Sequence, residues 1–295
     1  MRITENMVSA QLLGDIGRNR EEIVKLQSQL ASGRRVMKPS DDPQAADSIL
    51  RLQAVMDRNE QYLKGIADGS AMMEETSLAL NSAAEVLLDV RDELIRASNG
   101  TRQESLSVHA NRIDQLLSQL VEIANTKFNG KYIFGGTRTL EPPFTLAPDR
   151  SAVTANPNGI TGSISFAVAD GFLQTVNIDG QEAFLGTQMF QTIIQLRDQL
   201  ANGQFPAPGD VESVNALIEH LLGKASKAGS VVQSLAAQQA HLEEQQNQLR
   251  SLLSLDQDTD VPAAVLQLKN KEILLEAALN TGARILPKSL LDFLR

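Results

Sequence analysis

Two apolar stripes at opposite ends of the chain constrain its fold more than any other feature of the sequence. The N-terminal stripe follows alternating steps of four and three residues, interrupted once by polar Asn19, and consists of Leu12, Ile16, Ile23, Leu26 and Leu30. The C-terminal stripe consists of Val265, Leu268, Leu275, Leu279, Leu286 and Phe293. This spacing places each set on one face of a helix. Because an isolated helix is marginal in water, we expect the two segments to pack against each other or against neighbouring chains.

The link after the N-terminal stripe carries helix-boundary signals. Gly33 follows the last apolar position and suits the end of a helix. After a short basic stretch, either Asp41 or Asp42 can cap a new helix, and Pro43 suits its first turn. We therefore predict one helix that ends near Gly33 and a second that begins near Pro43.

The second helix is predicted to be long. Its pattern continues without proline from Gln44 to about Asn99, and at about 1.5 Å per residue such a helix forms a rod on the order of 80 Å. Gly65 and Gly69 are positions where it can bend or break. A further helix with an apolar face is expected to end near Lys127.

The pattern changes to short strands between residues 129 and 186. Aromatic and β-branched residues alternate there with glycine, proline and asparagine, and the segments 164–168 and 175–178 alternate apolar with polar positions. The pair Gly135 and Gly136 reads as turn glycines, because no phosphate-binding helix follows it. We predict a small strand-rich insertion.

Helical periodicity returns at residues 189–200 and 210–255, and a break at 256–262 precedes the last helix. The long segment includes a heptad-spaced seam of Leu235, Leu242 and Leu249, with Gln238, Gln245 and Leu252 at the companion positions. The predicted fold class is mainly α with a small β insertion. We expect terminal coiled-coil segments at 1–40 plus 257–295, a long-helix rod or bundle domain at 41–135 plus 186–256, and a strand-rich domain at 136–185.

Composition and charge exclude several functions. A net charge of -9 leaves no basic surface for nucleic acid. The chain has no cysteine, and His109, His220 and His241 are too scattered to form a metal site by spacing. No segment approaches the about 20 apolar residues of a membrane helix, and the N-terminus does not resemble a secretory signal. We therefore expect no nucleic-acid partner, no membrane insertion and no cleaved signal peptide.

No catalytic, cofactor or metal motif stands out. The zinc-protease, nucleophile-elbow, P-loop and dinucleotide-binding patterns are missing from the sequence. Asp256, Asp258 and Asp260 match the opening of a calcium loop, but Val261 replaces its glycine and Gln267 its closing glutamate. A solvated hinge and helix start is the better interpretation. The sequence therefore predicts no enzyme and no cofactor.

Three charged residues lie among apolar positions of the long helix. They are Arg91, Glu93 and Arg96. Such charges usually form surface pairs that contribute less than about 1 kcal/mol. The alternative is a contact between assembled subunits, so we retain them as candidate inter-subunit contacts. The Gln-rich run at 233–248 has the same two interpretations.

Four segments carry a resemblance to a known family. They are MRITENM at the start, QLASGRRVMKPSDDPQAAD at 29–47, VRDELIRASNGT at 90–101 and NTGARILPKSLLDFLR at 280–295. With these segments the sequence resembles the bacterial flagellin superfamily. KYIFGGT at 131–137, the SLLDFL ending and the short insertion are more similar to hook–filament junction proteins than to filament flagellins.

The resemblance implies a structural subunit of the flagellum and a place for each segment. The two terminal segments would form the inner layer of a tube, the long helices a surrounding rod layer, and the insertion the outer surface. The expected partners are the first hook-associated protein, flagellin, copies of this chain in a ring, and an export chaperone on the C-terminal helix. Export through the flagellar type III apparatus, to the flagellum outside the cell, follows from the same resemblance.

Three alternatives remain open from the sequence. One is a filament flagellin, and a second is a coiled-coil scaffold or adhesin unrelated to motility. The third is an enzyme within the insertion, although residues 136–185 contain no His and no Cys, which argues against a zinc or cysteine protease.

Overall fold

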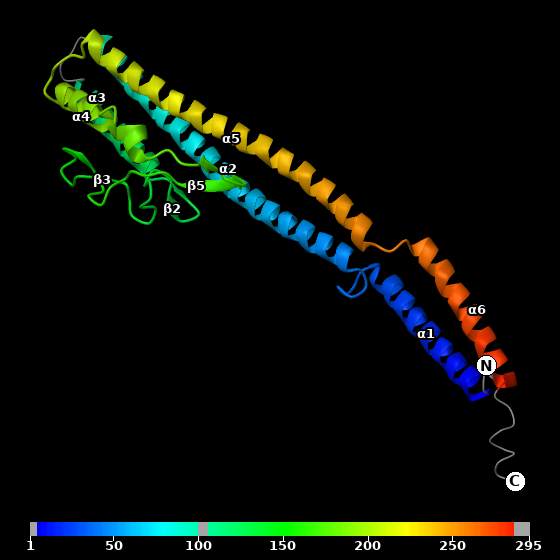
Figure 1. Ribbon diagram of the computed structural model, residues 1–295. Helices are drawn as coiled ribbons and strands as arrows, with labels where there is room; N and C mark the ends of the chain where they lie inside the picture. Colours follow the sequence, from blue (N-terminus) through cyan, green and yellow to red (C-terminus); the bar gives the residue numbers. More distant parts are fainter. Residues whose placement is uncertain (1–4, 100–105, 286–295) are drawn as a thin grey trace. The chain divides into compact units, whose positions relative to one another are not determined.

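The computed structural model describes residues 5–99 and 106–285. Contacts divide them into two compact units, one built from residues 5–58 and 245–285, the other from 59–99 and 106–244. Two long helices, α2 (Pro43–Asn99) and α5 (Pro208–Gln257), contribute to both units (Figure 1). The predicted fold class, mainly α with a small β insertion, is confirmed.

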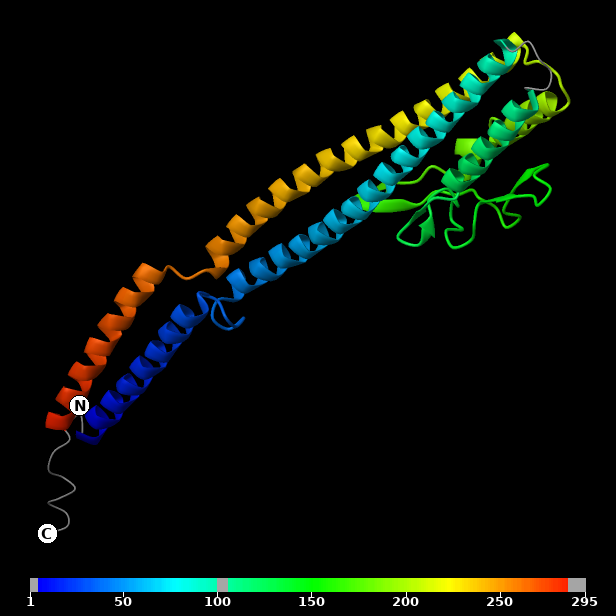
Figure 2. The same cartoon turned by 180° about the vertical axis from the view of Figure 1, so that it is seen from behind.

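The first unit contains a pair of helices from the two ends of the chain. Figures 1 and 2 show α1 (Glu5–Ser32) beside α6 (Val261–Ile285) in both views. Gly33, with φ +70°, follows α1 as predicted. The side chain of Asp42 accepts a 3.1 Å hydrogen bond from the amide of Ala45, so Asp42 caps α2.

The second unit has a helical core. It combines most of α2 and α5 with α3 (Leu106–Ala124) and α4 (Met189–Ala201), and α3 and α4 lie side by side (Figures 1 and 2). Their fully buried side chains include Leu80, Leu87, Leu94, Ile113, Leu116 and Leu117. None of the helices within the described residues is long and apolar enough to cross a membrane.

Helix α2 runs without interruption through Gly65 and Gly69. A Cβ on Gly69 would lie 2.9 Å from Cγ1 of Val176 and 3.2 Å from Cδ2 of Phe166, and one on Gly65 would lie 3.6 Å from the Ala167 carbonyl oxygen. These glycines therefore let the strand-rich segment approach the helix closely, and they do not break it.

The insertion forms three two-stranded antiparallel sheets. They pair β1 (Lys127–Phe128) with β2 (Lys131–Tyr132), β3 (Phe144–Leu146) with β4 (Val153–Ala155), and β5 (Ser165–Ala169) with β6 (Phe172–Thr175). The predicted strand at 175–178 is wrong, because β6 ends at Thr175. The side chain of Asn177 explains this: its Oδ1 accepts a 2.7 Å hydrogen bond from the amide of Ile164, and its Nδ2 donates to the Gly162 carbonyl at 2.8 Å.

Four phenylalanines hold the insertion against the helices. Phe184, on the π-helix η2 (Gln181–Leu185), contacts Phe134 and Phe144 edge-on, with ring centroids 5.0 and 5.6 Å apart, and stacks on Phe190 at 5.7 Å. Gly136, at φ +56°, forms the turn predicted for the Gly135–Gly136 pair. Four of the nine phenylalanines of the chain thus contact one another at this junction.

Candidate subunit interfaces

The N-terminal stripe lies on the side of α1 that faces α6. Ile23 is only 8% exposed, and the other members, Leu12, Ile16, Leu26 and Leu30, are partly buried. Asn19, the polar interruption, lies on the same face, where its side-chain amide donates a 3.1 Å hydrogen bond to the carbonyl of Lys271 on α6. Lys271 in turn pairs with Glu22 on α1. Asn19, which interrupts the apolar stripe, therefore forms a hydrogen bond between the two helices.

The described members of the C-terminal stripe differ in how deeply they are buried. Leu268 and Leu275 are partly buried on the face of α6 that also includes the buried Ala264 and Gly282. Val265 and Leu279 lie on the flank of this face and are 42% and 53% exposed. Leu286 and Phe293 lie outside the described residues.

Close approach at Gly282 explains part of the pairing. A Cβ on Gly282 would lie 3.2 Å from Cδ2 of Leu12, which is tighter than an ordinary contact. Gly282 therefore lets α1 and α6 come together near the end of α6, a role that the apolar spacing did not indicate.

The rest of α6 carries further uncovered apolar side chains. Leu266 and Ile273 are each more than half exposed and, at 3.6 residues per turn, lie opposite the Leu268–Leu275 face. Leu274 is exposed on a flank. With Val265 and Leu279, these residues place exposed apolar side chains on several sides of α6, among charged residues such as Lys269, Glu272 and Glu276.

The two interhelical linkers of the first unit are joined by backbone hydrogen bonds. The amide of Arg35 donates to the carbonyl of Gln257 at 2.7 Å, and the amide of Thr259 donates to the carbonyl of Gly33 at 2.9 Å. Between them, Arg34 and Asp258 form an antiparallel bridge. The segment QLASGRRV thus includes the residues that pair the α1–α2 linker with the α5–α6 linker.

Charged side chains reinforce this junction. The Arg35 guanidinium donates to the Asp42 carboxylate at 3.0 Å and to the Asp256 carbonyl at 2.8 Å. Hydrogen bonds from the Ala45 amide and from Arg35 lower the pKa of Asp42. A hydrogen bond from Lys25, followed by one from the Lys38 amide, lowers the pKa of Asp41.

The three aspartates that resemble a calcium loop have separate protein partners. Asp256 accepts from the Ser48 hydroxyl at 2.6 Å, Asp258 from the Ser254 hydroxyl at 2.6 Å, and Asp260 from the Ala263 amide at 3.1 Å at the start of α6. Within the residues that the structure describes, no cluster of His, Cys, Asp or Glu has the geometry to hold a metal ion. The arrangement matches the hinge and helix-start interpretation.

Arg91, Glu93 and Arg96 lie on α2 in the second unit. Arg96 donates to Glu93 at 3.2 Å, and the other Glu93 oxygen lies 2.7 Å from Nδ1 of His109 on α3. Arg91 contacts its neighbour Asp92 at 3.2 Å. Both carboxylate oxygens of Glu93 therefore already have partners within the second unit, whereas the Arg96 side chain is largely exposed.

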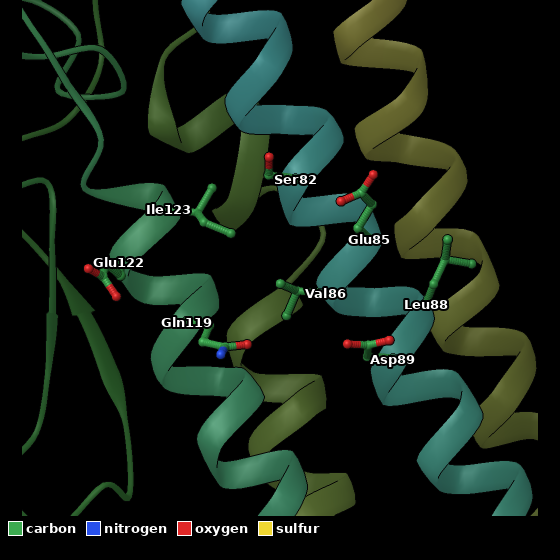
Figure 3. A pocket seen from close by; sticks show the side chains of 8 residues that line it. All are labelled: Ser82, Glu85, Val86, Leu88, Asp89, Gln119, Glu122 and Ile123. Carbon is green, nitrogen blue, oxygen red and sulfur yellow. The ribbon is translucent and has the colours of Figure 1, made fainter.

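A groove of about 630 Å³ lies between α2 and α3. In Figure 3, Glu85 and Asp89 project from α2, Glu122 projects from α3, and Val86 and Ile123 lie between the two helices. The groove is therefore acidic at its rim and apolar at its floor. Sequence periodicity did not indicate it, because its residues come from helices that meet only in the folded unit.

Two ion-pair networks anchor the insertion, and neither was predicted. Arg197 on α4 donates to Asp114 on α3 at 3.0 Å and to the Arg150 carbonyl at 2.7 Å. Burial alone would lower the pKa of Arg197, but hydrogen bonds to Asp198 and Asp114 outweigh it and raise that pKa. The second network centres on Glu182, which accepts from Lys224 and Lys227 on α5, each at 2.8 Å.

The N-terminal part of the sequence matches the family model of the bacterial flagellin N-terminal helical region, over residues 3–139. Residues 3–139 are therefore similar to the flagellin N-terminal helical region. This region includes α1, α2 and α3 and extends through the turn at Gly135 and Gly136. The resemblance to the flagellin superfamily is thus confirmed for this part of the chain.

Two curated relatives are named flagellar hook-associated protein 3. The protein from Salmonella typhimurium is 32% identical over 151 residues, and that from Escherichia coli is 32% identical over 149 residues. These matches cover 50% and 49% of this chain and 47% and 46% of the relatives, so the chain spans about half the length of the curated relatives it matches. A flagellin from Listeria monocytogenes is 23% identical over 127 residues.

Solved structures share the fold beyond the flagellin N-terminal helical region. A Vibrio parahaemolyticus protein described as a flagellar hook-associated protein aligns with a TM-score of 0.64 at 20% identity, over 74% of this chain and 99% of its own. FlgL from Bacillus cereus aligns with a TM-score of 0.58 at 23% identity, over 69% of this chain and 99% of its own. At these identities the likeness establishes the fold.

Proposed function

We propose that this chain is a structural subunit of the bacterial flagellum, at the junction between the hook and the filament. The observation that carries the proposal is the 32% identity to two proteins named hook-associated protein 3, compared with 23% to a flagellin. The flagellin N-terminal helical region supports the same class. The expected location is the flagellum outside the cell, reached through the type III export apparatus.

Assembly through the terminal helices is the second part of the proposal. The α1–α6 pair leaves five apolar side chains of α6 between 42% and 66% exposed, namely Val265, Leu266, Ile273, Leu274 and Leu279. Burial of one such side chain contributes about 1.5–3 kcal/mol, so contact with neighbouring copies offsets the entropy cost of ordering these helices. The N-terminal and C-terminal stripes, Leu286 included, would then lie in the inner layer of a ring.

The proposed partners follow from the resemblance to flagellar hook-associated proteins. The ring would contact the first hook-associated protein on one side and flagellin on the other. Before assembly, the exposed apolar side chains of α6 suit masking by an export chaperone, because exposed apolar surface promotes aggregation. The long helices would form the rod layer and residues 136–185 the outer layer. Arg91 and Arg96 remain candidates for contacts between neighbouring rods.

We propose no catalytic role. The curated relatives are flagellar proteins, and residues 136–185 contain no His and no Cys. A broad glycosidase screen of the purified chain is expected to be negative. Turnover that a single carboxylate substitution in the insertion abolishes would contradict this part of the proposal.

A deletion strain tests the location. Loss of a junction subunit is expected to leave hooks intact while flagellin monomers escape into the medium, and the intact gene should restore filaments. Loss of a filament flagellin, the main alternative, would remove filament material without release of other flagellin. Normal motility and filament yield in the deletion strain would contradict both and favour a scaffold unrelated to motility.

A further inference from the structure

The β5–β6 hairpin presents an apolar tip. Phe172 and Leu173 are 70% and 73% exposed. Since neighbouring strand residues point to opposite faces, both faces of the hairpin are uncovered at this point. The adjacent turn carries Asp170, whose side chain is exposed and has no hydrogen bond or ion pair to the described residues.

An apolar pocket lies elsewhere in the same unit, between α2 and the β1–β2 hairpin. Its volume is about 430 Å³, within the roughly 300–1,000 Å³ range of pockets that enclose small molecules, so it can admit an aromatic ring. Its apolar lining includes Met72, Phe128, Ile133, Ile164 and Phe166. Lys131 and Asp68 provide one positive and one negative charge at the pocket.

The hairpin tip does not fill the pocket of its own copy. Phe166 in β5 lines the pocket, whereas Phe172 pairs with Ala169, three residues further along that strand. At about 3.3 Å per residue, the tip lies about 10 Å beyond the pocket lining. The tip and the pocket of one chain are therefore both available to other molecules.

We propose that Phe172 of one copy inserts into this pocket on a second copy of the chain, with Asp170 facing Lys131. Each copy carries one tip and one pocket, so a head-to-tail contact uses both in every copy and generates a ring when the rotation closes. The single lysine at the pocket gives the Asp170 carboxylate one favourable orientation, away from Asp68. The contact depends on the surface of this chain alone and does not rest on the proposed location in the flagellum.

The size of the contact determines how it can be detected. A buried aromatic side chain contributes about 150–250 Å², far less than the roughly 1,200–2,000 Å² of a stable interface. The contact therefore orients copies that other surfaces hold together, and in solution it is transient. A covalent trap is the appropriate measurement.

The chain contains no cysteine, so engineered cysteines react without background. Full-length Leu173→Cys is mixed with full-length Thr139→Cys, whose substitution lies at the pocket, and the concentrated mixture is oxidised. We expect a disulfide between positions 173 and 139 of different copies, identified by peptide mapping. In the matched control, Leu78→Cys, at another exposed leucine, takes the place of Leu173→Cys. Its disulfide with Thr139→Cys should form about tenfold more slowly.

Further variants separate the proposed contact from random collision. Adding Phe172→Ala to the Leu173→Cys chain should slow the trapped reaction about tenfold. Asp170→Lys in the tip chain, or Lys131→Glu in the pocket chain, should slow it up to about fivefold, and the two together should restore the rate. Circular dichroism of each variant verifies its fold.

A reaction of Leu173→Cys no faster than that of the Leu78→Cys control would overturn the proposal. So would a rate unchanged by Phe172→Ala, or a charge swap that does not restore it. The disulfide experiment uses purified protein and tests only this contact. The deletion strain tests only the proposed location, so the two proposals can fail separately.

Discussion

The backbone amide of Arg35, in the α1–α2 linker, donates a 2.7 Å hydrogen bond to the carbonyl oxygen of Gln257, the last residue of α5. The backbone amide of Thr259 donates a second hydrogen bond, to the carbonyl of Gly33. Together the two bonds fix the α1–α2 linker beside the α5–α6 linker. The helices α1 and α6 leave this junction side by side, so its register determines which faces of the two helices meet.

Removal of the Arg35 side chain is expected to loosen the junction. Arg35→Ala loses a pair with Asp42 and a bond to the Asp256 carbonyl, and because the guanidinium is half exposed we expect a loss of about 1 kcal/mol. Hydrogen exchange of the Thr259 amide measures the local opening. Arg34→Ala, at an exposed side chain next to it, is the control and should leave exchange nearly unchanged; equal effects of the two variants would contradict the role of Arg35.

The same junction should weaken in acid. The pKa of Asp42 is lowered, so its stabilisation is fully present above the unfolded value of about 3.9 and is lost as pH falls through the folded value. Asp42→Asn keeps an acceptor but removes the charge. The difference in thermal midpoint between the original chain and this variant should shrink below about pH 4, whereas Asp57→Asn, at an exposed site, should show no such trend.

A methyl group at Gly69 should destabilise the second unit. In Gly69→Ala the Cβ would meet Cγ1 of Val176 at 2.9 Å, and such overpacking costs about 1–3 kcal/mol, more than the about 1 kcal/mol that alanine gains in a helix. Gly223→Ala in α5, where no atom lies within 4 Å, should instead stabilise by about 0.5–1 kcal/mol. Urea unfolding measures both, and opposite signs are the expected result.

Glu182 should contribute modestly to the attachment of the insertion. Hydrogen bonds from Lys224 and then Lys227 lower its pKa, but its side chain is 36% exposed, so Glu182→Gln is expected to cost only about 0.5–1 kcal/mol. The free energy of unfolding in urea measures the loss. Glu219→Gln, on the solvent-exposed surface of α5, is the matched control, and a cost equal to that of Glu182→Gln would argue against the network.

The terminal pair should be sensitive to charge on its inner face. Ile23→Asp or Leu275→Asp places a carboxylate between α1 and α6, which should expose both ends to protease and block incorporation while residues 59–244 stay folded. Val24→Asp, at an exposed neighbour of Ile23, should leave the protease pattern of the monomer unchanged. Limited proteolysis and filament yield are the measurements; normal assembly of Ile23→Asp would contradict the proposed role of the pair.

Local signals explain the parts of the fold that could be predicted. Gly33 ends α1 because of its backbone freedom, and Asp42 caps α2 because its side chain reaches the Ala45 amide; both effects act within a few residues. The face of α1 with Ile23 followed from spacing alone. Such features need no knowledge of the rest of the chain.

Long-range contacts explain the features that the sequence did not predict correctly. Gly65 and Gly69 are positions where the sequence allows α2 to bend or break, yet they accommodate Val176 and Phe166 from the insertion. The partners of Arg197 lie on α3 and in the loop at residue 150, so no local pattern pairs them.

The sequence by itself determined which residues share a helical face, because a period of 3.6 residues is a local property of the backbone. The tertiary structure alone decided which members of a face are covered. It placed Leu268 and Leu275 against α1 but left Val265 and Leu279 about half exposed, because burial depends on where the partner helix lies and how closely Gly282 lets it approach.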